Sequence, residues 1–477
     1  MTPILVWHRR DLRLTDNPAL RWAADQGRPV IPVFVLDEVV EAWGAAPRWR
    51  LDRSLRAHER RLRDAGSCLV LRRGRAADVV LALADETGAR TVAWNRLYVA
   101  DERARDDSVA DALTARGVAV ETFRGHVLRE PWEVETKSGG HYKVFTPYWR
   151  AARGHDPGEP TGPVERLDAP DQWPPGETLD DWRLGAAMDR GGDVVERYAV
   201  VGELAARDRL VGFVEDKAAD YEAGRDDLGA AGTSGLSENL TLGEISAREC
   251  WHAGRRALED GLDDAETFLK ELTWRDFSHQ LCWHAPHLTT RNWKPDWDDF
   301  PWREDNGDAE AWRRGRTGLP IVDAAMRQLW TTGTMHNRGR LITASFLTKH
   351  LLTHWRVGQA HFADCLVDWD PANNALNWQW TAGSGPDASP FFRIFNPETQ
   401  AKRFDRDETY RHRWVAELGR APEASGNRAA DGLAFFEATK RSWEMSPDDG
   451  YPEAPIMDLR EGRDRALAAF RQRKGDD

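Results

Sequence analysis

The order in which apolar runs occur along the chain is the feature that most restricts its fold. In the first 130 residues, short apolar runs alternate with amphipathic stretches, such as Pro47–Ala65 and Ala76–Thr87, that carry helical spacing. This alternation is typical of a parallel β-sheet covered by helices. The expected strands are Ile4–Trp7, Val30–Leu36, Cys68–Leu71, Thr91–Trp94 and Val118–Phe123.

The pattern changes twice after this region. Residues 131–207 are rich in Pro, Gly and Asp, which is typical of a long connector that crosses the surface. Beyond them, strand signals nearly vanish and helical patterns dominate, as in Pro320–Trp330 and Leu341–Trp355. Since 477 residues exceed one domain of ordinary size, we expect an α/β domain over 1–130, a connector over 131–207 and an all-α domain over 208–477.

Two kinds of site are disfavoured by the motifs. No GxGxxG fingerprint follows the first expected strand, where the turn reads HRRDLRLTDN, so the first domain is Rossmann-like without a dinucleotide site at that turn. The cysteines at positions 68, 250, 282 and 365 show no CxxC or other metal-ligand spacing. We therefore expect no disulfide framework, no iron–sulfur cluster and no other metal site.

Charge and hydropathy restrict the partners and the location. The net charge of −13 argues against nonspecific coating of nucleic acid, which requires a broad basic surface, but it permits a locally basic groove. The N-terminal apolar run is too short for a signal peptide, and no stretch approaches about 18 uninterrupted apolar residues. We expect a cytoplasmic protein that does not enter a membrane.

The tryptophan content is unusual, with 23 Trp against 7 Tyr. A buried indole N–H usually needs a hydrogen-bond partner, so tryptophan is a demanding residue to place. So many indoles indicate stacking surfaces or electron transfer, and a large aromatic core is the alternative that composition alone favours.

Seven segments together form a recognisable pattern. They are WHRRDLRLTDNPAL (7–20), TSGLS (233–237), ELTWRDF (271–277), RTGLPIVDAAMRQL (316–329), MHNRGR (335–340), LVDWDPANNALNWQW (366–380) and FFRIFNPETQ (391–400). In this order and with these gaps they resemble DNA photolyases and cryptochromes, most closely a class I photolyase for cyclobutane pyrimidine dimers. The resemblance covers nearly the whole chain and implies an α/β antenna domain, an all-α FAD-binding domain and light-driven repair by electron transfer from reduced FAD.

The resemblance implies where FAD binds. Thr233, Ser234 and Ser237 precede a helical run that we expect to begin near Leu242, and such a helix start suits the FAD diphosphate, although alone it would be an ordinary cap. Asn374 matches the asparagine that faces flavin N5, although alone it would be a turn residue. The implied set is Tyr221, Thr233, Ser234, Gly235, Leu236, Ser237, Phe268, Arg340, Asp368, Asp370 and Asn374, with Arg340 and Asp368 forming a salt bridge beside the isoalloxazine.

The resemblance also assigns the tryptophans. Trp302, Trp355 and Trp378 match the three residues that carry electrons from the surface to the flavin, whereas any one of them alone would be a core residue. Trp380 follows Trp378 by two positions, so on a helix it points to nearly the opposite side and can face a substrate.

The substrate side rests on a helical stripe. Glu271, Trp274, Arg275 and Ser278 share one face by their spacing, which could recognise bases and a phosphate or could be a solvated face. In the family, Glu271, Trp274, Asn337 and Trp380 line the pocket for a flipped-out thymine dimer. Arg338 and Gln400 correspond to further DNA contacts, and His336 is interpreted as packing or hydrogen bonding. Asn337, where enzymes for the 6-4 product have histidine, favours cyclobutane dimers.

Three departures leave a second function open. Gly235 stands where many relatives have arginine, Thr334 where tryptophan is usual, and Leu341 where methionine is frequent. A cryptochrome photoreceptor with the same fold and no repair activity is therefore the alternative, whereas an unrelated flavoprotein oxidoreductase is remote. We expect a monomer that acts on damaged DNA.

An antenna chromophore is the last expectation. The stretch NRLYVADERARD (95–106) resembles the folate-binding segment of class I photolyases, with Asp101 and Glu102 as the implied contacts. Methenyltetrahydrofolate is the first expectation, a deazaflavin the second and an empty site the third.

Overall fold

The N-terminal part of the protein contains one five-stranded parallel sheet. The computed structural model describes residues 1–387, 392–419 and 428–474, so Phe391, at the start of the FFRIFNPETQ segment, lies outside the described residues. Its strands pair in parallel, as the alternating pattern predicted, and their order is β3-β2-β1-β4-β5. The strands are β1 (Ile4–His8), β2 (Val30–Leu36), β3 (Val70–Arg73), β4 (Thr91–Asn95) and β5 (Ala119–Phe123).

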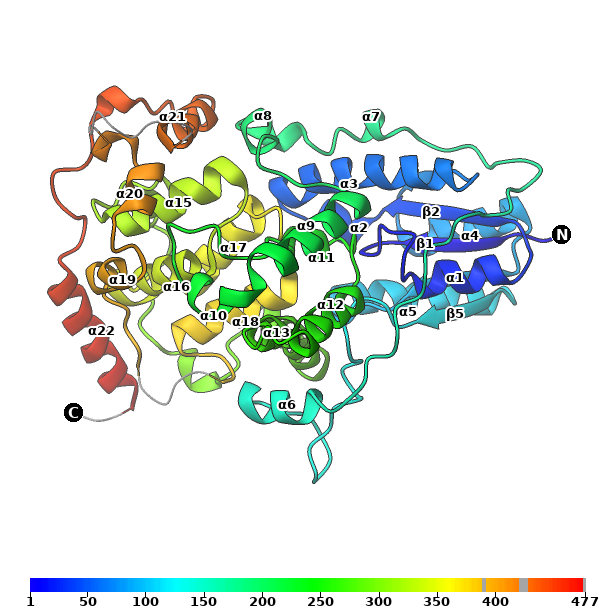
Figure 1. Cartoon of the computed structure of the whole chain (residues 1–477), viewed down its shortest axis with the longest axis horizontal. Coiled ribbons are helices and arrows are strands. Elements are labelled where there is room, and N and C mark those ends of the chain that lie inside the picture. Colours follow the sequence, from blue (N-terminus) through cyan, green and yellow to red (C-terminus); the bar gives the residue numbers. More distant parts are fainter. Residues whose placement is uncertain (388–391, 420–427, 475–477) are drawn as a thin grey trace.

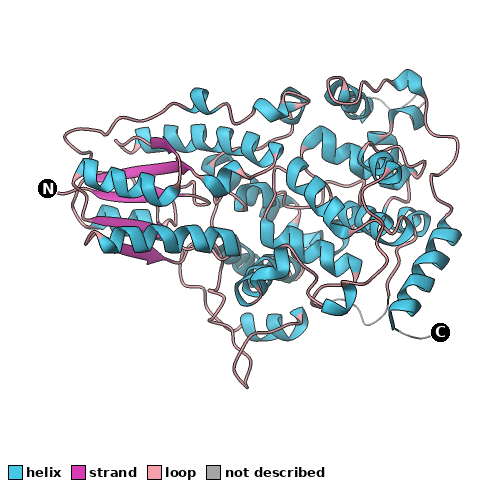
Figure 2. Cartoon of the chain, turned by 180° about the vertical axis from the view of Figure 1, so that it is seen from behind, coloured by secondary structure: helices cyan, strands magenta, loops and turns pink. Residues whose placement is uncertain are grey.

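Helices cover both faces of this sheet, which explains why its strands β1 and β2 are buried throughout (Figures 1 and 2). On one face, α1 (Pro18–Asp25) and α3 (Ala45–Asp64) share a hydrophobic cluster with β1 and β2. On the other face, α4 (Ala76–Thr87) and α5 (Ala100–Ala115) do the same. The short α2 (Glu38–Glu41) follows β2.

The connector wraps the sheet domain before the chain becomes helical. Its segments hydrogen-bond to the sheet domain, for example from Val30 N–H to the Asp168 carbonyl. It carries α6 (Phe145–Ala152), α7 (Leu179–Trp182) and α8 (Gly192–Val195). Helix α9 (Glu203–Asp216) begins inside the predicted connector.

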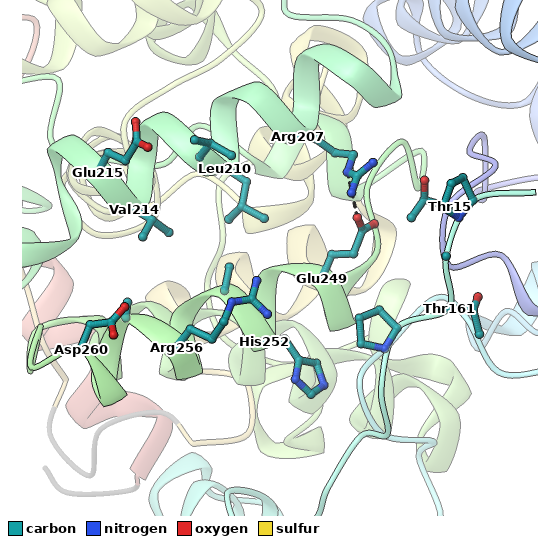
Figure 3. A pocket seen from close by; sticks show the side chains of 16 residues that line it. Thr15, Thr161, Arg207, Leu210, Val214, Glu215, Glu249, His252, Arg256 and Asp260 are labelled. Carbon is teal, nitrogen blue, oxygen red and sulfur yellow. Dashed lines mark ion pairs between the residues drawn. The ribbon is translucent and has the colours of Figure 1, made fainter. Parts of the chain in front are cut away.

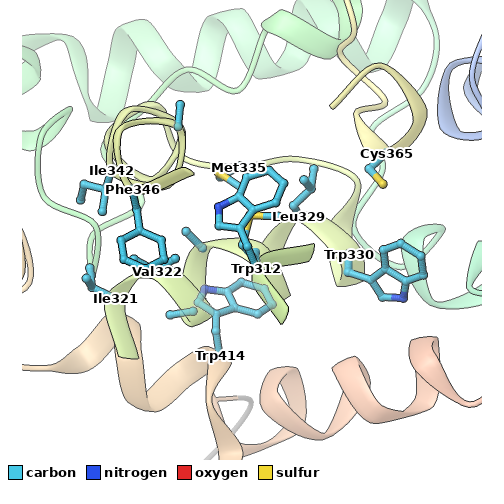
Figure 4. Packing of buried hydrophobic residues seen from close by; sticks show 14 of the residues in the cluster. Trp312, Ile321, Val322, Leu329, Trp330, Met335, Ile342, Phe346, Cys365 and Trp414 are labelled. Atoms are coloured by element: carbon cyan, nitrogen blue, oxygen red, sulfur yellow. The ribbon is translucent and has the colours of Figure 1, made fainter. Parts of the chain in front are cut away.

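The remaining described residues are helical and form no further strand (Figure 1). Helix α15 is central: Ile321, Val322 and Leu329 contact a core that also contains Trp312 and Trp414 (Figure 4). The principal helices are α10 (Tyr221–Gly224), α11 (Ser237–Leu240), α12 (Ala247–Glu259), α13 (Ala265–His284), α14 (Gly307–Arg313), α15 (Pro320–Thr332), α16 (Asn337–Ser345), α17 (Trp355–Cys365), α18 (Pro371–Ala382), α19 (Pro397–Phe404), α20 (Thr409–Trp414), α21 (Arg428–Thr439) and α22 (Leu459–Lys474). No described helix is both long enough and apolar enough to cross a bilayer.

Two helix predictions were wrong because contacts between distant segments interrupt the helices. The expected helix Leu341–Trp355 is broken: α16 ends at Ser345, a π-turn follows over Phe346–His350, and α17 begins at Trp355. In the π-turn the buried Lys349 ammonium donates to the Ala382 carbonyl at the end of α18.

The helix expected near Leu242 is also absent at that point. Gly243 has a left-handed backbone (φ 64°), and an added Cβ would lie 2.1 Å from the Arg10 carbonyl oxygen of the sheet domain. The long helix therefore starts only at Ala247, where Ser246 and Glu249 form a capping box.

Candidate functional site

One cavity of about 480 Å³ in the helical domain collects most of the predicted site residues. Its wall comes from α10, the loop before α11, and helices α13, α16 and α18. Gln400, Trp302 and Trp355 do not line it. The predicted residues that do are Tyr221, Thr233, Ser234, Gly235, Leu236, Ser237, Phe268, Glu271, Trp274, Arg275, Ser278, Asn337, Arg338, Arg340, Asp368, Asp370, Asn374, Trp378 and Trp380.

The loop 233–237 is built differently from the expected helix start. The α11 helix that follows has only four residues, so it cannot supply the helix-end field that the sequence suggested. Instead, Lys217 donates to the Thr233 carbonyl at 3.2 Å and Arg209 to the Gly235 carbonyl at 2.5 Å. Gly235 is left-handed (φ 67°) and Leu236 right-handed, a succession that gathers backbone N–H groups into a concave anion site.

Arg340 and Asp368 form the predicted salt bridge, with Nη2 and Oδ2 2.7 Å apart. The other Asp368 oxygen, Oδ1, is buried without a hydrogen-bond partner, as are His336 Nε2 and Thr381 Oγ1 on the same cavity wall. Buried polar atoms are normally satisfied. These orphaned atoms therefore fit a polar ligand, and the cavity suits FAD.

Asn374 presents a defined atom to the cavity. Its amide nitrogen donates to the Gln359 carbonyl at 3.1 Å, which leaves Oδ1 as the atom available to a ligand. An oxygen here can accept a hydrogen bond from an N–H group of a ligand.

Asp370 and Arg275 form a buried polar group in the cavity wall. Asp370 caps α18 and contacts His279 at 3.1 Å. Burial opposes its ionisation, but His279 and Arg275 lower the pKa of Asp370 well below its ordinary value.

The expectation that Arg275 meets a DNA phosphate was wrong. Its guanidinium is buried and donates to the His126 carbonyl at 2.5 Å and to the His126 ring at 2.9 Å. His126, His279 and Asp370 are close enough to share a metal ion, but the Arg275 cation already occupies the His126 nitrogen.

The outer wall of the cavity carries two ion pairs that sequence reasoning missed. Arg225 Nη1 lies 2.8 Å from Glu271, and Asp226 accepts from Arg338 at 2.8 and 2.5 Å. Burial raises the pKa of Glu271, and Arg225 opposes this shift. The YEAGRD segment that carries both partners had no spacing signal of its own, because the pairs join residues far apart in the chain.

The remaining predicted substrate residues lie as follows. Asn337 is exposed at the start of α16, where His336 caps the helix by accepting the Arg338 N–H at 3.1 Å, as interpreted from the sequence. The Ser278 hydroxyl donates to the Trp274 carbonyl within α13. Gln400 lies on α19, outside the cavity wall.

The three tryptophans of the predicted electron route differ in their exposure to the cavity and to solvent. Trp378 lines the cavity, Trp355 is fully buried and donates to Asn292 at 2.8 Å, and Trp302 is partly exposed. The His354 ring lies between the last two, at 5.3 Å from Trp302 and 5.5 Å from Trp355. Gly358 makes room for Trp378, because an added Cβ would lie 2.0 Å from that indole.

The predicted antenna pair faces two directions. Glu102 is buried between the domains and pairs with Arg10 at 2.8 Å, and Arg10 also contacts Thr241 of the helical domain. Asp101 is exposed. One Glu102 oxygen therefore holds the domain interface, and the other, Oε2, is buried without a hydrogen-bond partner.

A second cavity of about 460 Å³ lies between α9 and α12 and contains none of the predicted site residues (Figure 3). Its wall is mainly apolar, with Leu210 and Val214, and an ion pair joins Arg207 to Glu249 at 3.1 Å.

Comparison with known proteins places both parts of the chain in one family. Residues 4–168 match DNA photolyase, and residues 268–472 match the FAD binding domain of DNA photolyase. A deoxyribodipyrimidine photo-lyase from Agrobacterium fabrum is 44% identical over 98% of this chain and 97% of that protein. Cryptochrome-1 from Arabidopsis thaliana is 35% identical over 88% of this chain and 63% of that protein.

Solved structures agree with the sequence matches. A bacterial class III photolyase from Agrobacterium tumefaciens superimposes with a TM-score of 0.90 at 44% identity, covering 100% of this chain and 98% of that one. With the two-part fold and the Arg340–Asp368 pair in its cavity, the chain belongs to the DNA photolyase/cryptochrome family.

Proposed function

We propose that this chain binds FAD in the 480 Å³ cavity and repairs cyclobutane pyrimidine dimers in DNA with light. The observation that carries the proposal is that one cavity joins the flavin-type contacts to Glu271, Trp274, Asn337 and Trp380. A photoreceptor would need the flavin contacts alone. A carboxylate, an amide and two indoles beside them suit two linked neighbouring bases of one strand that have flipped out of the double helix.

Each part of the cavity has a task in this reaction. Bound FAD supplies the light absorption and the transferred electron. The loop 233–237 holds the diphosphate with its N–H groups, and Asn374 Oδ1 accepts a hydrogen bond from a ring N–H of the flavin. Glu271 accepts base N–H groups, and the indoles of Trp274 and Trp380 stack on the bases and exclude water.

We propose a different subclass from the one that the sequence resemblance suggested, and we keep the order of the antenna chromophores. The sequence resemblance suggested class I, but the Agrobacterium structure at 44% identity bears the class III designation, and we propose class III for this chain. A second chromophore remains a proposal, with folate before a deazaflavin. Arg10 engages Oε1 of Glu102, so the atoms that could meet that chromophore are the buried, unpartnered Oε2 of Glu102 and the exposed carboxylate of Asp101.

A cryptochrome photoreceptor is the second candidate, favoured by the 35% identity to Cryptochrome-1 and by Gly235 and Thr334. The deciding experiment illuminates the FAD-loaded, chemically reduced protein with blue light on an oligonucleotide that contains one thymine dimer. We expect intact thymines to reappear only in the light. Light-dependent flavin changes without any repair would support the photoreceptor.

The Asp226–Arg338 pair leads to a prediction about DNA affinity. The Asp226 carboxylate accepts two hydrogen bonds from the Arg338 guanidinium, as a DNA phosphate could. Asp226→Asn should therefore free Arg338 to bind the DNA backbone. We expect affinity for damaged and undamaged DNA to rise about two- to fivefold at low salt. The slope of log K against log salt should steepen by about one.

Asp111→Asn is the matched control, because it removes an equal charge from an exposed position of α5. It should leave the salt slope unchanged. An unchanged slope in Asp226→Asn would mean that Arg338 does not contact a phosphate.

A further inference from the structure

The connector covers one face of the Trp274 indole, the face that points away from the cavity. The rings of Phe145 and Trp274 are parallel, with centroids 3.7 Å apart and planes 9° apart. Phe145 is buried and does not line the cavity, whereas Trp274 does. The Phe145 ring therefore forms the back support of the indole, and the opposite face of the indole remains for a ligand.

Phe145 is the first residue of α6, which packs against α13 (Figure 1). Val144 at the N-cap position has no side chain that could accept the free N–H groups of the helix. The Asp387 carboxylate of a distant segment faces this helix start, where the Phe145 backbone N–H lowers the pKa of that carboxyl against the larger, raising effect of burial. A residue of the helical domain thus lies at the start of the connector helix.

Asp387 also holds the second indole. Its backbone carbonyl accepts the Trp380 Nε1–H at 3.1 Å. Its own backbone is left-handed (φ 54°), an uncommon conformation for a residue other than glycine that persists only when surrounding contacts hold it. Here those contacts include the hydrogen bond from Trp380 and the approach of the carboxylate to the start of α6.

We propose that Phe145 and Asp387, which we call the α6 clasp, are positioning residues that set the orientation and separation of Trp274 and Trp380. The two indoles come from different helices, α13 and α18. The clasp joins them through one connector residue and one loop residue. The clasp therefore helps the site to distinguish a dimer from undamaged DNA. Through Phe145, the connector becomes part of the substrate site. This inference rests on the proposed repair function.

The test compares paired variants of the FAD-loaded protein on dimer-containing and undamaged oligonucleotides. Phe145→Leu keeps an apolar side chain but removes the ring stacking, and Phe145→Tyr keeps the stacking. We expect Phe145→Leu to weaken dimer binding about two- to tenfold and Phe145→Tyr to restore it. Binding to undamaged DNA, flavin content and the rate of flavin photoreduction should stay at wild-type levels in both.

A second pair tests the other half of the clasp. Asp387→Ala removes the acceptor and disfavours the left-handed backbone, whereas Asp387→Asn keeps an oxygen acceptor and tolerates that backbone. We expect dimer affinity to fall in the first variant and to stay near wild type in the second. If Phe145→Leu loses its flavin, the comparison of Asp387→Ala with Asp387→Asn tests the clasp instead.

The outcomes separate the two levels of the argument. If the wild type itself does not prefer the dimer, the proposed repair function fails. If the wild type prefers the dimer and Phe145→Leu equals Phe145→Tyr, or Asp387→Ala equals Asp387→Asn, the clasp is only structural and the inference is overturned.

Discussion

Replacing Trp378 with Phe is expected to reduce photoreduction of the oxidised flavin to a small fraction of the wild-type rate. Trp378 is the member of the proposed route that lines the cavity, whereas Trp355 and Trp302 do not. A benzene ring is much harder to oxidise than an indole, so an electron from Trp355 would have to cross the gap in one long step. Absorbance of the flavin under blue light with an external reductant measures the rate.

Repair by this variant should survive once its flavin has been reduced chemically, because that electron passes to the DNA and not along the tryptophans. Trp251→Phe is the matched control: it also removes a buried indole, but one that packs on Trp149 outside the cavity. Photoreduction should be normal in this control. Normal photoreduction in Trp378→Phe would show that the assigned route is wrong.

Removing the Trp274 indole is expected to cause the largest loss of affinity for damaged DNA. Phe145 covers one face of this indole, so a base can stack only on the other. Stacking of a base on an aromatic side chain contributes about 1–3 kcal/mol, which corresponds to a roughly tenfold to hundredfold weaker dimer complex for Trp274→Ala. Binding of dimer-containing oligonucleotide in the dark measures this loss.

The flavin spectrum of Trp274→Ala should change little, because Arg340, Asp368 and Asn374 remain in place. Trp132→Ala is a suitable control, since Trp132 is an exposed indole that contacts Trp283 and does not line the cavity. Dimer affinity equal to wild type in Trp274→Ala would remove the indole from the proposed site.

The sequence predicted most of the residues that line the site, but only some of the contacts that these residues make. The motif segments correctly brought Thr233, Arg340, Asp368, Asn374 and Trp378 to one cavity. Their side-chain types and order along the chain carry that information. Arg275 was misplaced, because helical spacing gives the face of a residue and not the group that it meets. His126, which binds its guanidinium, is 149 positions away in the chain.

The sequence by itself determined the parallel sheet, because the apolar period of each short strand is a local property. It also determined the helical character of the second half. Only the tertiary structure decided where helices break, as at Gly243 beside Arg10 and at the buried Lys349. It alone decided the ionic partners of Glu271 and Arg338 and the support of Trp274 by Phe145. These contacts join side chains from separate segments, and a local pattern records which groups are present but not which of them meet when the chain folds.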